Sequence, residues 1–103
     1  MPRTTPPLPL PVQRALKKFG ADIRDARRRR RIMTSVMADR LQISRPTLRR
    51  LEQGDPAVGM GSYATALYVL GMVERLANFA SITNDPVGQQ LSSDALPKRI
   101  TTK

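Results

Sequence analysis

The chain of 103 residues contains no cysteine, no histidine and no tryptophan, and only 4% of its residues are aromatic. Without cysteine and histidine it cannot form a disulfide framework, a thiolate or imidazole metal site, or a nucleophile activated by histidine. Its Asp and Glu residues show no spacing that indicates acid/base catalysis. We therefore expect a protein that is not an enzyme and that carries no metal or cofactor.

Long apolar segments are also lacking. The N-terminal sequence has no apolar region of the kind that a signal peptide needs, and no apolar stretch approaches the length of a membrane span. A small secreted domain without disulfides would lack its usual reinforcement. These absences predict a cytoplasmic protein of one small domain, with no membrane partner.

Charge is abundant but strongly one-sided. The chain has 18 Lys and Arg against 8 Asp and Glu, a formal net charge of +10. Residues 1–52 hold 14 of the basic residues and four acidic ones, whereas residues 53–103 hold four of each. A localised basic block is expected for a polyanionic partner, and nucleic acid is a commoner one than an anionic membrane. The alternative is a solvated charge run that only aids solubility.

Proline content and apolar spacing divide the chain into three parts. Residues 1–11 contain five prolines, which predict a flexible arm or, with weaker support, a ligand for a proline-recognition domain. We expect the folded domain to span residues 12–82. Residues 83–103 are polar and interrupted by proline and glycine, so we expect an extended tail. A tail that folds on a partner would bury Leu91, Leu96 and Ile100.

Helical periodicity is visible in five segments of residues 12–82, and no segment predicts a strand. The first helix is expected from Val12 into the arginine run, with an apolar stripe of Val12, Leu16, Phe19, Ile23 and Ala26. Further helices are expected at about residues 34–41, 44–53, 60–70 and 73–80, the last of which should bury Leu76. Gly54 and Gly71 are the predicted terminators of the third and fourth helices. Gly20 lies off the stripe and should weaken the first helix by about 1 kcal/mol relative to alanine.

The segment 34–54 carries the functional signal, because it contains two short helices separated by three residues. Thr34 or Ser35 can cap the first of them and Ser44 the second. At about 100° per residue, three arginines (Arg45, Arg49 and Arg50) fall on one side of the second helix and its leucines on the other. The apolar side can pack on Met37, Ala38 and Leu41, which leaves the arginines free to enter a DNA major groove. An ordinary amphipathic helix with a basic solvent face is the alternative.

This segment resembles the Xre family of Cro/cI-type helix-turn-helix regulators. The resemblance rests on Met37-Ala38, Leu41, Ile43-Ser44, Thr47-Leu48, Leu51-Glu52 and Gly54. It implies an all-α fold, a compact five-helix lambda-repressor-like helix-turn-helix domain over residues 12–82. The chain departs from the family pattern at Met33, Thr34 and Gln42, where a Ser/Thr cap, a phosphate-binding Gln and a turn Gly usually stand. Gln42 would have to adopt a left-handed conformation, which costs about 1 kcal/mol.

The resemblance implies a sequence-specific repressor that binds a palindromic operator in double-stranded DNA as a homodimer, with half-sites about 34 Å apart. We expect Arg45, Thr47, Arg49 and Arg50 at the bases, and Arg28, Thr34 and Ser44 at the phosphates. In the family register, Arg27 pairs with Glu52 and fastens the third helix to the first. A further set is expected to form a dimer surface around the fifth helix or, equally, to complete a thin core: Tyr68, Met72, Phe79 and Ile82.

Features outside this segment resemble the antitoxins paired with Hip-type serine/threonine kinase toxins. They are the Asp-Ala-Arg-Arg-Arg-Arg-Arg run at 25–31, the segment 63–67, the Leu70-Gly71-Met72 join, and the tail segments 85–88 and 96–100. This resemblance implies an autoregulating antitoxin of a type II toxin–antitoxin pair, located on the nucleoid. A stand-alone Xre-type regulator and a basic protein-interaction adaptor are the alternatives. RNA binding is disfavoured by the shortage of aromatic residues for base stacking.

Overall fold

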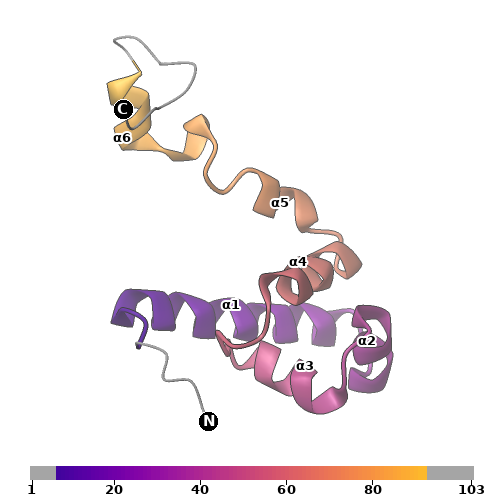
Figure 1. Cartoon of the computed structure of the whole chain (residues 1–103). Coiled ribbons are helices and arrows are strands. Elements are labelled where there is room, and N and C mark those ends of the chain that lie inside the picture. Colours follow the sequence, from indigo (N-terminus) through magenta and orange to yellow (C-terminus); the bar gives the residue numbers. More distant parts are fainter. Residues whose placement is uncertain (1–6, 93–103) are drawn as a thin grey trace. The chain divides into compact units, whose positions relative to one another are not determined.

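The computed structural model describes residues 7–92, and within that range the chain is helical without a strand (Figure 1). The all-α prediction is therefore confirmed. The chain divides into two units, Met1–Val73 and Glu74–Lys103. The first unit contains α1 (Leu10–Arg29), α2 (Thr34–Leu41), α3 (Arg45–Glu52) and α4 (Met60–Val69). Helix α5 (Val73–Ala77) begins at the division, and the second unit continues with the 3₁₀ helix η1 (Ile82–Asn84) and with α6 (Pro86–Leu91).

The core of the first unit is built by α1 to α4. Its largest fully buried side chains are Ile23 of α1, Met37 of α2, and Leu48 and Leu51 of α3. Helix α3 packs against both α1 and α2, and α2 also packs against α4. The apolar face expected on α2, formed by Met37, Ala38 and Leu41, is confirmed as buried.

The predicted apolar stripe of α1 is wrong at its first member, because Val12 is 42% exposed. A Cβ atom on Gly54, at the end of α3, would collide with the backbone of Leu16 and Lys17. Val12 lies one helical turn before Leu16, toward the start of α1.

Gly20, which the sequence marks only as a weak point in α1, is buried at the contact between α1 and α3. A Cβ atom at this position would lie 2.5 Å from the amide nitrogen of Gly54 and 2.6 Å from the carbonyl oxygen of Leu51. Two backbones meet there with no room for a side chain. Glycine at position 20 lowers the helix propensity of α1, but its lack of a side chain is what allows these two helices to pack closely.

Helices α1 to α4 all end with one residue in the left-handed region, namely Arg31, Gln42, Gly54 and Gly71. After each, an amide bonds to the carbonyl five residues earlier: Ile32 to Arg27, Ile43 to Ala38, Asp55 to Arg50 and Met72 to Leu67. This is the Schellman pattern of helix termination. The two glycine terminators and the left-handed Gln42 are confirmed, whereas nothing within a run of five arginines identified Arg31 as a terminator.

The helix starts follow the sequence in part. The Ser44 hydroxyl accepts a hydrogen bond from the Thr47 amide at 3.1 Å, so the predicted cap of α3 is confirmed. The predicted cap of α2 is wrong, because the extended residue before this helix is Met33 and no side chain caps it. Helix α1 starts at Leu10, inside the predicted arm, since Pro11 occupies its first turn, where a proline needs no donor.

The second unit has no buried side chain among its described residues, 74–92. Leu76, expected to be buried, is only partly covered, and α5 ends at Ala77. The extended tail is wrong for residues 86–91, which form α6 because Pro86 fits the first turn and the Asp85 carboxylate accepts from the Gly88 amide at 3.0 Å. The division after Val73 also precedes the boundary expected at residue 82. Residues 1–6 of the predicted arm and 93–103 of the predicted tail, with Leu96 and Ile100, lie outside the described range.

Candidate nucleic-acid interface

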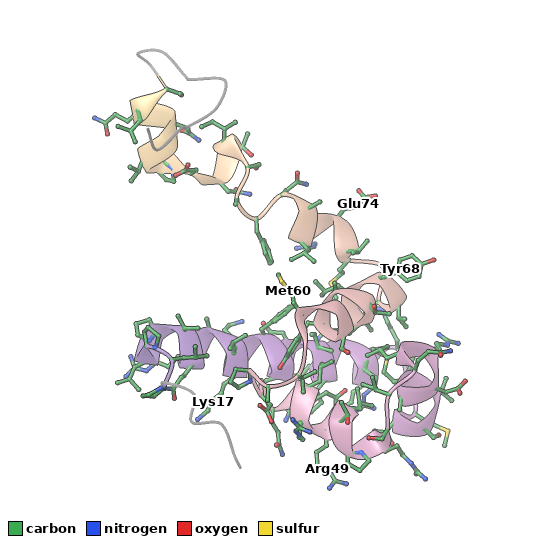
Figure 2. All side chains as sticks on the ribbon, in the orientation of Figure 1. Lys17, Arg49, Met60, Tyr68 and Glu74 are labelled. Carbon is green, nitrogen blue, oxygen red and sulfur yellow. The ribbon has the colours of Figure 1, made fainter. Side chains whose placement is uncertain are left out.

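Helix α3 separates into an apolar and a basic side, as its sequence predicts. Leu48 and Leu51 are 1% and 0% exposed. Arg45, Arg49 and Arg50 are all exposed, and Figure 2 shows the Arg49 side chain extending away from the ribbon of the first unit. Three guanidinium groups are thus held at the surface by a helix whose other side is part of the core.

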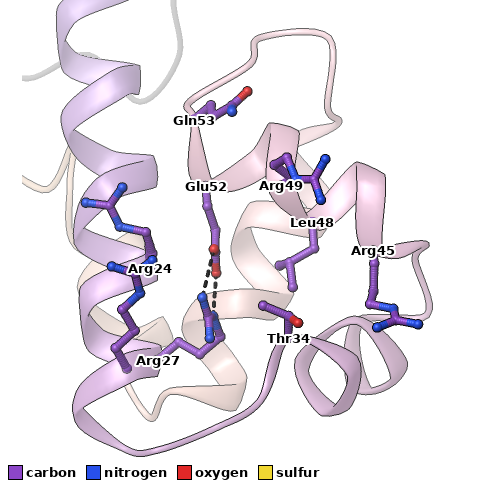
Figure 3. A pocket seen from close by; sticks show the side chains of 9 residues that line it. Arg24, Arg27, Thr34, Arg45, Leu48, Arg49, Glu52 and Gln53 are labelled. Atoms are coloured by element: carbon purple, nitrogen blue, oxygen red, sulfur yellow. Dashed lines mark hydrogen bonds and ion pairs between the residues drawn. The ribbon is translucent and has the colours of Figure 1, made fainter.

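A pocket of about 450 Å³ lies between α1, the start of α2 and α3 (Figure 3). It is lined by Arg24, Arg27, Arg28, Thr34, Arg45, Leu48, Arg49, Glu52 and Gln53. Five of these residues are arginines and one is a glutamate, so the lining carries a formal charge of +4. A hollow with this excess of positive charge suits an anion.

The tertiary structure brings four of the predicted DNA-contacting residues together at this pocket: Arg28, Thr34, Arg45 and Arg49. It adds Arg24, which the sequence reasoning missed. Arg24 stands four residues before Arg28 on α1, so the two share one side of the helix. That spacing is the signal that could have identified it.

The inner wall of the pocket contains the ion pair expected between Arg27 and Glu52, and the structure confirms it. Arg27 Nε donates to Glu52 Oε2 at 2.7 Å, and Nη2 donates to Oε1 at 3.1 Å. Arg27 Nη1 donates to the carbonyl oxygen of Ile32 at 2.9 Å. The two side chains are 7% and 8% exposed. Three of the five N–H donors of this guanidinium are thus used within the protein, and Arg27 fastens α3 to α1.

Thr34 lines the pocket at the first position of α2. No side chain in residues 7–92 caps the start of this helix. The amide groups of its first turn are therefore not satisfied by a cap, and they carry the positive end of the helix dipole. Such a helix start adds donors for an anion to the charge of the surrounding arginines.

Two other predicted site residues, Ser44 and Thr47, bond to each other instead of lining the pocket. The Ser44 hydroxyl donates to Thr47 Oγ1 at 2.9 Å while it accepts from the Thr47 amide. The hydroxyl of Ser44 therefore already donates a hydrogen bond within the protein. The hydroxyl of Thr47 donates none to another group in residues 7–92.

Arg50 also lies apart from the pocket. Its Nε donates to Asp55 Oδ2 at 2.9 Å, and the amide of Ala57 and the guanidinium of Arg50 hold the pKa of Asp55 below its usual value. Sequence reasoning did not single out Asp55. Its position five residues after Arg50, just beyond the end of α3, is a weak signal, because the Schellman turn at Gly54 is needed to bring the two side chains together.

The residues expected at a dimer surface do not complete a core. Tyr68 on α4 is 70% exposed, Phe79 is 59% exposed and Ile82 is 50% exposed. Met72 is partly covered. None of the four lies in α5, which spans Val73–Ala77. The dimer surface expected around these residues stays a prediction.

Among residues 7–92, no helix is both long enough and apolar enough to cross a membrane. Comparisons with protein-family models, with curated proteins and with solved structures found no match to this chain.

Proposed function

We propose that this chain is a sequence-specific DNA-binding regulator with a five-helix, lambda-repressor-like helix-turn-helix domain of the Xre type. In this proposal α2, residues 42–44 and α3 are the helix-turn-helix, and α3 is the recognition helix. The observation that carries it is the exposure of Arg45, Arg49 and Arg50 on one side of α3. The other side is anchored in the core through Leu48 and Leu51 and through the ion pair of Glu52.

The chemistry of the exposed side suits the major groove. An arginine can donate two hydrogen bonds to O6 and N7 of one guanine, and a well-placed pair of this kind is worth about 1–3 kcal/mol of discrimination. Arg45, Thr47, Arg49 and Arg50 are the residues we assign to the bases. A rigid helix also restricts where each guanidinium can reach, which favours sequence selectivity over loose charge attraction.

The phosphate contacts are assigned to the other side of the pocket. Arg24 and Arg28 extend from α1, and Thr34 stands at the uncapped start of α2. Together they form a basic rim next to α3, where one DNA strand would pass when α3 lies in the groove. Ser44 is a weaker candidate than its sequence position indicates, because its hydroxyl proton is donated to Thr47.

A repressor of this size is expected to bind as a homodimer to a palindromic operator, since one recognition helix reads only a few base pairs. We assign the dimer surface to the exposed apolar residues, among which Tyr68 on α4 is prominent in Figure 2. Such a regulator would act in the cytoplasm, on the nucleoid.

We further propose that the regulator is the antitoxin of a pair with a Hip-type kinase toxin. The support is the sequence resemblance together with one feature of the second unit. Ile82, Val87 and Leu91 are at least half exposed, and this unit buries no side chain of its own in residues 74–92. Exposed apolar side chains on a segment without a core suit a protein partner. A stand-alone regulator remains the second candidate.

DNA binding is tested by a mobility-shift titration against the DNA upstream of the chain's own gene, with unrelated DNA as competitor. Wild type is compared with Arg45→Ala and Arg49→Ala, and Arg75→Ala in the second unit is the matched control. We expect a competitor-resistant complex, an affinity loss of about tenfold or more in the first two variants, and no change in the control. Binding that is equally strong to unrelated DNA and indifferent to Arg45 and Arg49 would refute the proposal.

The toxin partner is tested separately by co-expression with any serine/threonine kinase encoded next to this chain. The readout is kinase autophosphorylation with and without the chain, together with co-elution of the two proteins. Inhibition in a stable complex supports the antitoxin, whereas full kinase activity without co-elution favours the stand-alone regulator.

A further inference from the structure

Arg50 and Asp55 form an ion pair that has no evident structural purpose. The Nε–Oδ2 distance is 2.9 Å, and the two side chains are 49% and 31% exposed. Pairs as exposed as this one contribute little to the free energy of folding, because water screens their attraction and because ordering two side chains costs entropy. The pair differs in this respect from Arg27–Glu52, which is buried and fastens two helices.

Asp55 is nevertheless held firmly. Its Oδ1 accepts from the Ala57 amide at 2.8 Å, and its own backbone carbonyl accepts from the Tyr63 hydroxyl at 2.8 Å. Tyr63 is 5% exposed, and its ring stacks on Phe19 with a centroid distance of 5.5 Å. Side chains from α1 and α4 thus fix the backbone of Asp55, and its carboxylate bonds to the Ala57 amide and to an exposed arginine of α3.

The ion pair with Asp55 leaves both Nη atoms of Arg50 free to donate to a base. Only Nε is used by Asp55, and in residues 7–92 the structure assigns no acceptor to Nη1 or Nη2. The end of a guanidinium, with both Nη atoms, is a pair of donors that matches O6 and N7 of guanine. A carboxylate bound at Nε restricts rotation of the side chain and leaves that pair of donors free.

We propose that Asp55 is a positioning residue that fixes Arg50 for bidentate recognition of one guanine, an inference that rests on the proposed DNA-binding function. Ordering the side chain before binding lowers the entropy lost when the base contact forms. The negative charge of Asp55 also opposes a contact between Arg50 and a phosphate. Asp55 therefore raises the preference for the correct base more than it raises affinity for DNA in general.

The experiment measures base preference position by position. A preferred duplex is first selected from a randomised library with the wild-type chain, and each base pair is then substituted in turn. Dissociation constants are determined at one salt concentration for wild type, Asp55→Asn, Arg50→Ala and Arg50→Lys. Asp39→Asn is the matched control, since it removes the same charge from an exposed position on α2 and does not contact Arg50. Thermal unfolding of each variant is recorded in parallel.

We expect Arg50→Ala to lose about tenfold of the preference for guanine at one position. Asp55→Asn should lose most of the preference at that same position, with equal or slightly tighter binding to unrelated DNA. Arg50→Lys should keep only part of the preference, because an ammonium can donate to guanine but has no Nε through which Asp55 could fix a two-donor fork. Asp39→Asn should keep the wild-type preference at every position.

The outcomes separate this inference from the proposed function. A wild-type chain that selects no sequence refutes the proposed function itself. A selective wild type whose Asp55→Asn variant keeps its preference at the Arg50 position overturns the positioning role. So does an Asp55→Asn variant that loses affinity equally at all positions, because that pattern reports a structural defect of the loop. If Asp55→Asn fails to fold, Arg50→Lys still decides whether the Arg50 fork reads a guanine, and an unchanged preference there overturns the inference.

Discussion

Gly20 and Gly54 bring the backbones of α1 and α3 into direct contact: a Cβ on Gly20 would stand 2.5 Å from the Gly54 nitrogen. Gly54 combines this contact with a left-handed φ of 76°. Because the neighbouring atoms are backbone, they cannot move aside as a flexible side chain would. The contact sets the depth at which the recognition helix of the proposed interface sits against α1.

Gly20→Ala is therefore expected to destabilise the first unit by about 2 kcal/mol, as overpacking outweighs the gain in helix propensity. Gly61→Ala on α4 is the matched control, since a Cβ there meets no atom within 4 Å, and it should be stabilising by up to about 1 kcal/mol. Urea unfolding followed by circular dichroism measures both. A Gly20→Ala variant as stable as wild type would show that the two helices are not held this closely.

Arg27→Met should cost about 3–5 kcal/mol of unfolding free energy, because it leaves the Glu52 carboxylate buried without its partner. The double variant Arg27→Met/Glu52→Leu should recover much of that loss, since no charge is then left unpaired. Chemical denaturation of the single and double variants completes a double-mutant cycle. Additive losses would mean that the two side chains do not interact in solution.

Asp55 should make stability depend on acidity. Its pKa is lowered in the folded chain from the ordinary value of 3.8, first by the Ala57 amide and then by Arg50. The carboxylate therefore contributes stability that is present above about pH 4 and is lost as the pH falls through the lower folded pKa. Unfolding of wild type and Asp55→Asn should differ by a constant amount near neutral pH and converge on acidification. A difference that widens below pH 4 would have the wrong sign.

Arg24 and Arg28 should contribute to DNA affinity through phosphates alone. The affinity for DNA, as log K, falls as log salt concentration rises. Replacing either arginine by alanine should make this slope less steep by about 0.9, the value for one phosphate contact. The base preference should stay unchanged, and Arg75→Ala should leave the slope as in wild type. Fluorescence anisotropy at several salt concentrations gives these slopes. An unaltered slope in both variants would place the phosphates elsewhere.

Local sequence determined much of the first unit. The Ser44 cap, Pro46 in the first turn and the glycine at 54 mark the bounds of α3 because each acts on its own neighbouring backbone. Helical spacing alone predicts that Arg45, Arg49 and Arg50 share a side opposite Leu48 and Leu51. The pairing of Arg27 with Glu52 followed from the register of the Xre resemblance, since a contact across 25 residues has no local signal.

Tertiary structure alone decided the rest, because it depends on which backbones and side chains meet across the chain. From the sequence, Gly20 is predicted only to weaken α1, and its role in packing becomes visible once Gly54 is placed against it. Arg24 joins the basic pocket, and Arg50 leaves it for Asp55, only once α1, α3 and the turn after α3 are packed together. In the second unit, apolar residues with helical spacing do not form a core, because none of those in residues 74–92 is buried. Periodicity predicts which residues share a face of a helix, but it does not predict what packs against that face.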